Sequence, residues 1–435
     1  ARVSEVGATI VDDELMPSIH VKYSSLHTPN ELRIALERQG LRDMKSYLDV
    51  LGVTKKVLGT REAHRTATYA MAKRAFEQRT RWLDVRFTLF RPDSGSTAEA
   101  SNTIAMNEAL WGMHDGLREF KAEEPGFRYF LTPGIRKERN SFRRDFGDKA
   151  RDLADQVAQL RAFMQNPNNR GVARKIQFVD TFGNETGFGI DDFDLFRPFL
   201  SALSDLRIGL RSHHGEHFGH LEDGINSMRW AMERWNVNQI EHGIAAGINT
   251  VDRMHTIRDH ILALCNGEAT QKPLQKYEVD ELRRIEIHHP KLRPVIDTVI
   301  SKAEKKESLS ISDIMALDFA ISEHAAYMYE LQRSVVAGLK DRNVSVTMLP
   351  TSNRALAEVA RMRKHPFISL GQTGIRLGLG TDNVTVLGTN MLREVAKVML
   401  ARPKDFAMSG ALTMALASET SNPENEVNLY LKQGA

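Results

Sequence analysis

Histidine and carboxylate side chains recur where short apolar runs of this 435-residue chain end. Three of these ends read "HHGE" (213–216), "EHG" (241–243) and "TDN" (381–383), and an earlier stretch, "SIHVKYSS" (18–25), carries His20 and Lys22. Two histidines and an aspartate form a familiar ligand set for a divalent ion. Zinc with one open position lowers the pKa of bound water to about 7, so a site built from these residues would supply hydroxide at neutral pH.

The pair His20 and Lys22 leaves the nature of this site open. Side chains two residues apart on a strand point to the same face, so the two would project together. The stretch is a damaged metal site, an altered metal site or an ordinary half-buried strand. Single histidines on strands are more often ordinary polar residues than ligands, and Asp or Asn at a strand end commonly caps the next helix. The metal hypothesis therefore depends on the order of the motifs and their shared strand-end position.

Eight extended runs alternate with longer helical patterns along the chain. The runs lie at 18–25, 82–90, 127–135, 175–182, 207–215, 238–243, 344–350 and 375–383. Such alternation predicts a parallel sheet covered by helices, and eight strands are the number that closes a barrel. The predicted fold class is α/β, a (β/α)8 TIM-type barrel. Its carboxyl strand ends share one rim, where catalytic residues of such barrels lie.

About 100 residues separate the runs at 238–243 and 344–350, more than one crossover helix needs. We therefore expect one barrel domain over residues 1–435 with a helical insertion at 250–340 between strands 6 and 7. Within it, residues 316–341 predict a long buried helix. A separate inserted domain is compatible with the sequence but not required. Large inserted helices often make subunit contacts, which is compatible with a homo-oligomer.

The composition narrows the class of protein. Hydrophobic residues make up 41% and charged residues 26%, and the net charge is +3, which indicates a globular protein rather than one that coats a nucleic-acid polymer. Cys265 is the single cysteine, which excludes an intramolecular disulfide and a cysteine-based zinc cage. Without a run of about 18 apolar residues or a secretory leader, we expect a cytoplasmic protein that does not enter a membrane.

Taken in order, the motifs resemble those of the adenosine and AMP deaminase family, metal-dependent amidohydrolases with a (β/α)8 barrel. That family carries H-x-H on strand one, a glycine after strand four, H-A-G-E after strand five, H-G after strand six and D-D after strand eight. The corresponding stretches here are "HVK", "DTFGNE", "HHGE", "EHG" and "TDN", and "LDVRFTL", "LPTSN" and "HPFISLGQTGIRLGLGTD" also match. The resemblance runs from about residue 15 to 425, outside the insertion.

The resemblance implies a hydrolase that replaces the exocyclic amine of an adenine nucleoside or nucleotide with oxygen. It implies one zinc ion held by His20, His213 and Asp382. Glu216 would pass a proton to a purine ring nitrogen, and His242 would orient the attacking hydroxide. Asp382 would serve the catalytic step as well as the metal.

The same resemblance assigns the substrate side of the site. Gly183 would contact the purine through its backbone, and Asn383, which replaces the family's second aspartate, would bind the purine through its amide. Lys22 replaces the second histidine of H-x-H, and its ammonium, with an ordinary pKa of about 10, repels zinc. Lys22 would then substitute for part of the metal charge or contact a phosphate. Ser24 belongs to "YSSLHT", which is closer to the His-Ser stretch of AMP deaminases than to the Asp-Gly of adenosine deaminases.

A phosphorylated substrate would need cationic partners near the rim. The candidates are Arg86, Arg136, Lys137 and Arg139. Arginine forks suit phosphate oxygens, although each of these residues has an alternative as ordinary surface charge.

Two rival functions remain alongside purine deamination. One is a weakened or inactive relative that binds a nucleotide as a sensor or assembly subunit, which Lys22 favours. The other is a different amidohydrolase reaction, because such barrels host many reactions. A lysine introduced in the laboratory at position 22 would also explain the departure. In each case the expected partner is a small molecule, an adenine compound with or without phosphate for the leading hypothesis.

Overall fold

A computed structural model describes residues 58–88, 106–137, 146–183, 185–267, 272–357, 359, 361–382, 387 and 389–401. Its strands are β1 (Trp82–Thr88), β2 (Arg128–Arg136), β3 (Phe178–Phe182), β4 (Gly209–His214), β5 (Gln239–His242), β6 (Ser345–Met348) and β7 (Leu377–Leu379). Each falls within one of the extended runs expected from the sequence or one residue beyond it.

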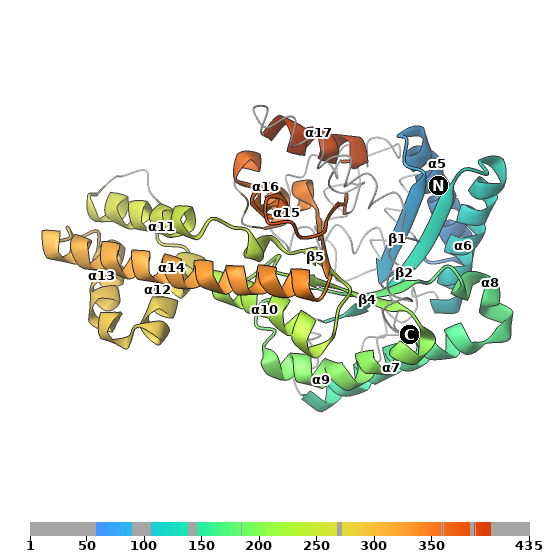
Figure 1. Cartoon of the computed structure of the whole chain (residues 1–435), viewed down its shortest axis with the longest axis horizontal. Coiled ribbons are helices and arrows are strands. Elements are labelled where there is room, and N and C mark those ends of the chain that lie inside the picture. The colour runs from blue at the N-terminus through green and yellow to red at the C-terminus, as the bar shows by residue number, and fades with distance from the viewer. Residues whose placement is uncertain are drawn as a thin grey trace, which may run out of the picture.

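Helices separate and cover these strands (Figure 1). On the barrel they are α5 (Arg61–Glu77), α6 (Met106–Glu123), α7 (Phe146–Gln165), α8 (Arg170–Ala173), α9 (Ile190–Ser201), α10 (Leu221–Arg234), α15 (Pro350–Leu356), α16 (Pro366–Gly371) and α17 (Met391–Ala401). Those between β5 and β6 are α11 (Thr250–Cys265), α12 (Lys276–His288), α13 (Arg293–Lys305) and α14 (Ile311–Asp341). Short 3-10 turns are η1 (Pro167–Asn169), η2 (Ser204–Leu206), η3 (Ile244–Ala246), η4 (Pro290–Leu292) and η5 (Met362–Lys364).

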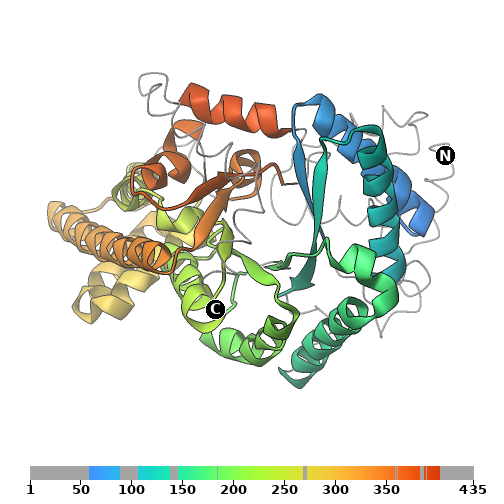
Figure 2. The same ribbon diagram turned by 45° about the vertical axis from the view of Figure 1, so that its right-hand side comes forward.

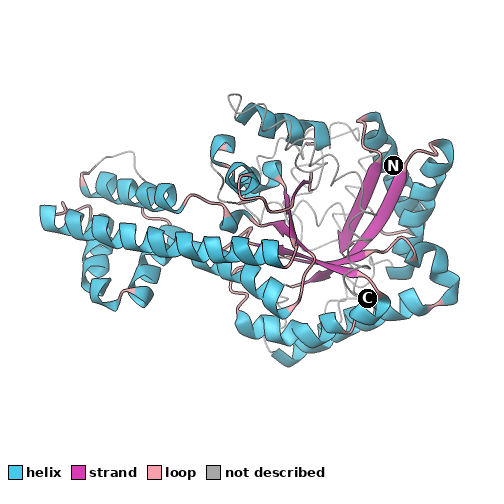
Figure 3. Cartoon of the chain, viewed as in Figure 1, coloured by secondary structure: helices cyan, strands magenta, loops and turns pink. Residues whose placement is uncertain are grey.

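In the part of the chain that the structure describes, the sheet has seven strands in chain order, β1 to β7. Neighbouring strands are parallel throughout, and the sheet curls with its helices on the outside (Figures 2 and 3). The expected (β/α)8 barrel class, with a helical insertion between strands 6 and 7, is confirmed. The candidate first strand at 18–25 lies outside the described residues.

The main hydrophobic cluster lies between the strands and the helices that cover them. Val179 of β3 and Ile240 of β5 are fully buried in it, together with Leu117 of α6, Leu160 of α7 and Ile225 of α10. Because side chains alternate along a strand, these apolar residues face outward to the helices and leave the opposite strand face to other residues. In the described part of the chain, no helix is both long and apolar enough to cross a membrane.

The insertion has a hydrophobic cluster of its own, separate from that of the barrel. Helix α14 belongs to both, because Leu317 packs in the inserted cluster and Val335 in the barrel cluster. The helix also begins five residues before the expected start at 316. Ser310 accepts a hydrogen bond from the Asp313 backbone, and the Asp313 carboxylate accepts one in return, a capping box that starts the helix at Ile311.

A buried carboxylate joins the insertion to the barrel. Glu281 of α12 accepts a hydrogen bond from the Leu221 amide at the start of α10 (2.7 Å) and pairs with Arg253 of α11 (2.7 Å). Burial raises the pKa of the Glu281 carboxyl, but the Arg253 charge, His324 and the Leu221 amide outweigh burial and lower that pKa to about 2. We propose from this tie, and from the shared α14, that residues 250–340 are an insertion within one barrel domain.

Glu281→Gln should destabilise the fold because it removes the buried negative charge that pairs with Arg253. We expect a loss of about 3 kcal/mol in the free energy of unfolding at pH 7, measured by urea unfolding. Since the folded pKa lies below the ordinary value, the contribution of Glu281 is present above pH 4.5 and is lost as the pH falls toward 2. The gap between variant and parent should therefore close over that range. An unchanged gap at pH 3, or a similar loss in the exposed control Glu330→Gln, would contradict this assignment.

Candidate active site at the carboxyl ends of the strands

The two neighbouring histidines at the end of β4 point to opposite sides of the sheet. His214 faces outward, is fully buried, and packs against Phe193 (ring centroids 5.1 Å) and Trp235 (5.4 Å). His213 faces the barrel interior, where its ring lies 5.1 Å from that of His242 at the end of β5. The strand alternation thus makes His213 the histidine available to a site and makes His214 part of the core.

His213 is held in place by a carboxylate from the neighbouring strand. Its Nδ1 donates to Oδ1 of the buried Asp180 on β3 (3.1 Å). With Nδ1 used in this way, Nε2 is the ring nitrogen left to face the rim, which is the usual arrangement behind a metal-binding histidine.

Charged side chains fill the barrel interior beneath His213. Arg86 of β1 reaches across the barrel to Glu241 of β5 (2.6 Å) and lies 3.9 Å from Asp180. Arg211 of β4 pairs with Asp84 of β1. Burial lowers the pKa of Arg86, but the charges of Glu241, Asp84 and Asp180 outweigh burial and raise it. The layer below the rim is therefore a network of paired charges, whereas branched apolar side chains usually fill such barrels.

Glu216 and His242 form a buried acid–base pair at the rim. Oε1 of Glu216 lies 3.3 Å from Nδ1 of His242, and both residues are buried. Burial raises the pKa of Glu216 to about 8. The charge of His213 lowers this pKa, and the charge of Asp382 raises it, but burial has the largest effect. Burial and the nearby charge of His213 hold the pKa of His242 well below its ordinary value. At neutral pH the pair therefore consists of a protonated carboxyl and a neutral imidazole.

The hydrogen bonds around Asn353 determine which nitrogen of His242 carries its proton. Nδ1 of His365 accepts from the Phe367 amide (3.0 Å), so its Nε2 donates to Oδ1 of Asn353 (3.2 Å). The Leu349 amide donates to the same oxygen (3.2 Å), which turns the Asn353 amide nitrogen toward Nδ1 of His242 (2.8 Å). Nδ1 of His242 is then an acceptor, and its proton resides on Nε2.

Two further predicted residues follow strands at left-handed backbone positions. Gly183, after β3, has φ +116°, and Asp382, after β7, has φ +54°. The Asp382 carboxylate helps to raise the pKa of the Glu216 carboxyl. Five predicted site residues thus lie at carboxyl strand ends: Gly183, His213, Glu216, His242 and Asp382. His20, Lys22, Ser24 and Asn383 lie outside the described residues, so the structure does not test their predicted roles.

The phosphate candidates that the structure describes are engaged inside the protein. Arg86 pairs with Glu241 as described above. Lys137 is fully buried, and its Nζ donates to the backbone oxygen of His213. Neither is placed as a free surface cation for phosphate. The side chain of Arg136 and the whole of Arg139 are outside the described part of the chain.

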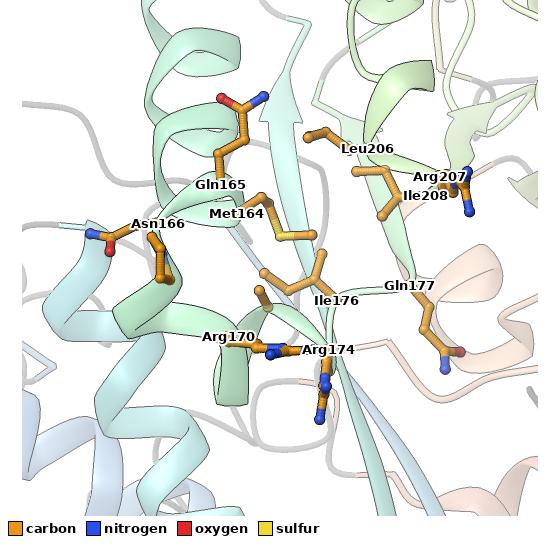
Figure 4. A pocket seen from close by; sticks show the side chains of 12 residues that line it. Met164, Gln165, Asn166, Arg170, Arg174, Ile176, Gln177, Leu206, Arg207 and Ile208 are labelled. Atoms are coloured by element: carbon orange, nitrogen blue, oxygen red, sulfur yellow. The ribbon is translucent and has the colours of Figure 1, made fainter.

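A separate cavity of about 560 Å³ lies at the opposite ends of the strands (Figure 4). Its wall is formed where α7 and α8 end and β3 and β4 begin, and includes Ile176, Ile208 and the exposed Arg174. The amino ends of barrel strands serve stability rather than catalysis. This cavity is therefore not part of the candidate active site.

Residues that the sequence did not single out support the site. Asp180 and Asn353 occur within the matching stretches "DTFGNE" and "LPTSN", but their partners His213 and His242 are distant in the chain. Their position was the available signal, because Asp180 lies on a predicted strand and Asn353 lies three residues after one. His365 is the first residue of the matching stretch "HPFISLGQTGIRLGLGTD", but nothing local indicates its contact with Asn353.

Asn353→Asp should reverse the tautomer of His242, because a carboxylate oxygen accepts from Nδ1–H where the amide nitrogen donated to Nδ1. We expect the proton on Nδ1 in the variant and on Nε2 in the parent, measured by nitrogen NMR of labelled imidazoles. Turnover should fall by about 10- to 100-fold, the usual effect of losing such a supporting partner. The exposed control Asn266→Asp should change neither quantity. An Nε2 proton in both proteins would refute the assigned network.

No protein-family model matches the chain. An adenosine deaminase of Lactococcus lactis is 22% identical over 247 residues, an alignment that spans 50% of this chain and 69% of that protein.

Solved structures share the fold over nearly the whole chain. The adenine deaminase of Arthrobacter aurescens aligns with a TM-score of 0.54 and 14% identity, covering 98% of this chain and 97% of that one. Arabidopsis ADAL complexed with GMP aligns with a TM-score of 0.57 and 13% identity, covering 99% of this chain and 91% of that one. The Arabidopsis N6-mAMP deaminase aligns with a TM-score of 0.56 and 14% identity, covering 100% of this chain and 94% of that one. In its motifs and in its fold, this chain resembles the adenosine and AMP deaminases.

Proposed function

We propose that the protein is a purine deaminase, a hydrolase that removes the exocyclic amine of an adenine nucleoside or nucleotide. The observation that carries this proposal is the buried pair of Glu216 and His242 at the carboxyl rim of a parallel barrel, beside His213. A carboxyl that is still protonated at neutral pH is a proton donor, and a neutral imidazole with a fixed tautomer is an orienting group.

Glu216 and His242 have different proposed roles. Glu216 donates a proton to a purine ring nitrogen, which makes the adjacent carbon that bears the amine more electrophilic. His242 orients the attacking water oxygen through Nε2–H. The amine leaves as ammonia, and the purine keeps an oxygen in its place. Gly183 and Asn383 are proposed to contact the purine.

The described donors fit a divalent metal ion in type. His213 presents Nε2 while a buried carboxylate holds its Nδ1, and Asp382 is a carboxylate near the same rim. Among the described residues, no group of three or more His, Cys, Asp or Glu is arranged to hold a metal. We propose His20 as the third ligand of one zinc ion. Such an ion, when bound, would supply hydroxide at neutral pH.

A nucleotide is our preferred substrate within this class. The stretch "YSSLHT" is like that of AMP deaminases, and two structural relatives are described with nucleotides, one complexed with GMP and one named an N6-mAMP deaminase. Lys22 and Ser24 are proposed to contact this substrate. We further propose a cytoplasmic protein that acts on a small molecule and not on a membrane or nucleic-acid polymer, and whose insertion serves a homo-oligomer contact.

Glu216→Gln should abolish proton donation while preserving shape. We expect kcat for ammonia release to fall by about 10²- to 10⁴-fold with little change in binding of the substrate, tested on adenosine, AMP, N6-methyl-AMP and ATP. The surface control Glu233→Gln should keep full activity. Retention of activity within threefold by Glu216→Gln would remove this carboxyl from the reaction.

Metal content separates the enzyme from its rival, a nucleotide-binding relative without turnover. We expect about one zinc per chain by elemental analysis, lost in His213→Ala and retained in the His214→Ala control, because only His213 faces the rim. Lys22→His should tighten zinc binding. Absence of metal and ammonia release from the parent, with both restored by Lys22→His, would instead favour the nucleotide-binding function. Deamination by a metal-free parent would refute the proposed metal role.

A further inference from the structure

Glu185, three residues after β3, has its carboxylate inside the protein beneath the "HHGE" loop. It accepts hydrogen bonds from three consecutive backbone amides, those of Gly215 (3.0 Å), Glu216 (2.6 Å) and His217 (2.9 Å). It also accepts from the hydroxyl of Ser227 on α10 (3.0 Å). One buried side chain thus accepts from three consecutive amides of the loop that carries the proposed proton donor.

The backbone of this loop is shaped to hold an anion. Gly215 has φ +66°, and a Cβ there would lie 2.8 Å from the sulfur of Met228, so both the turn and the close packing require glycine. Consecutive amides that converge in this way form an anion-binding nest. Burial raises the pKa of Glu185, but His214, Lys137 and the His217 amide outweigh it and lower the pKa to about 2, so the carboxylate stays ionised.

Lys137 holds the backbone at the end of β4 through a second contact. It is fully buried at the end of β2 and donates to the backbone oxygen of His213. The backbone from His213 to His217 is therefore fixed by a cation at its carbonyl and by the Glu185 anion at its amides. His213 and Glu216, which the proposed function uses, lie within this fixed segment.

We propose that Glu185 is a positioning residue that sets the place of Glu216 for proton transfer, with Lys137 as its counterpart at His213. This inference rests on the proposed function. Glu185 touches no substrate in this assignment and acts only through the loop amides. Its loss would leave three buried amides without a partner and would let the Glu216 backbone move. A misplacement of about 1 Å at a reacting group is enough to lower turnover about 100-fold.

The test uses Glu185→Ala with and without formate, because formate is a small carboxylate that can refill the emptied nest. In Glu185→Ala we expect kcat to fall about 100-fold, with KM within about threefold of the parent. Addition of 0.1 M formate should raise the kcat of this variant at least about tenfold. Glu185→Gln keeps one acceptor oxygen, so its kcat should lie between those of the parent and of Glu185→Ala. Its kcat should not respond to formate. The matched control Glu278→Ala removes a buried carboxylate that caps α12, and should lower stability without this kcat effect.

Amide hydrogen exchange of residues 215–217 gives a second measurement that does not depend on turnover. Protection should be lost in Glu185→Ala and regained with formate. Unchanged protection in Glu185→Ala, or a loss of kcat that formate does not relieve, would overturn the proposal. If the parent deaminates no adenine compound, the proposed function fails, and the exchange measurement still decides whether Glu185 fixes the loop.

Discussion

The pairing of buried charges inside the barrel is the constraint on which the site depends. Arg86 spans the interior from β1 to Glu241 on β5 and lies near Asp180, which in turn fixes His213. Removing one member of such a buried network leaves its partners charged and uncompensated, which is strongly destabilising. Strands β1, β3, β4 and β5 therefore keep their relative positions partly because these charges must meet. The position of His213 at the rim is therefore set by this network of buried charges.

Above this layer of paired charges, Glu216 and His242 are neutral groups. Glu216 keeps its proton because burial disfavours its carboxylate, and His242 stays neutral because burial disfavours its cation. Glu185, beneath the same loop, remains ionised because backbone amides and nearby cations stabilise its charge. Two glutamates separated by one loop thus have opposite protonation states. Environment, not residue type, assigns one to proton transfer and the other to structure.

The sequence predicted the seven described strands and the barrel class because the apolar runs and their helical spacers are local patterns. It also placed Glu216, His242 and Asp382 at carboxyl strand ends, since parallel strands put those ends on one rim. Pairings between distant residues carried no local signal, so Asn353 and His365 were missed. Lys137 was a candidate for phosphate binding, with ordinary surface charge as the alternative. Lysine is rarely buried, and its fully buried position here follows from partners that sequence spacing does not reveal.

Helix α14 contributes side chains to the cores of both the insertion and the barrel. Its 31 residues span about 46 Å as one continuous rod, and the rod supplies core side chains at both ends. An excision that joined residue 249 directly to residue 342 would remove Val335 and Leu339 of α14 from the barrel core. A shortened protein that keeps the barrel intact would instead have to break this helix between Ala325, the last side chain of the inserted core, and Met328, the first of the barrel core. The natural place to divide the molecule therefore lies inside a helix, not in a loop.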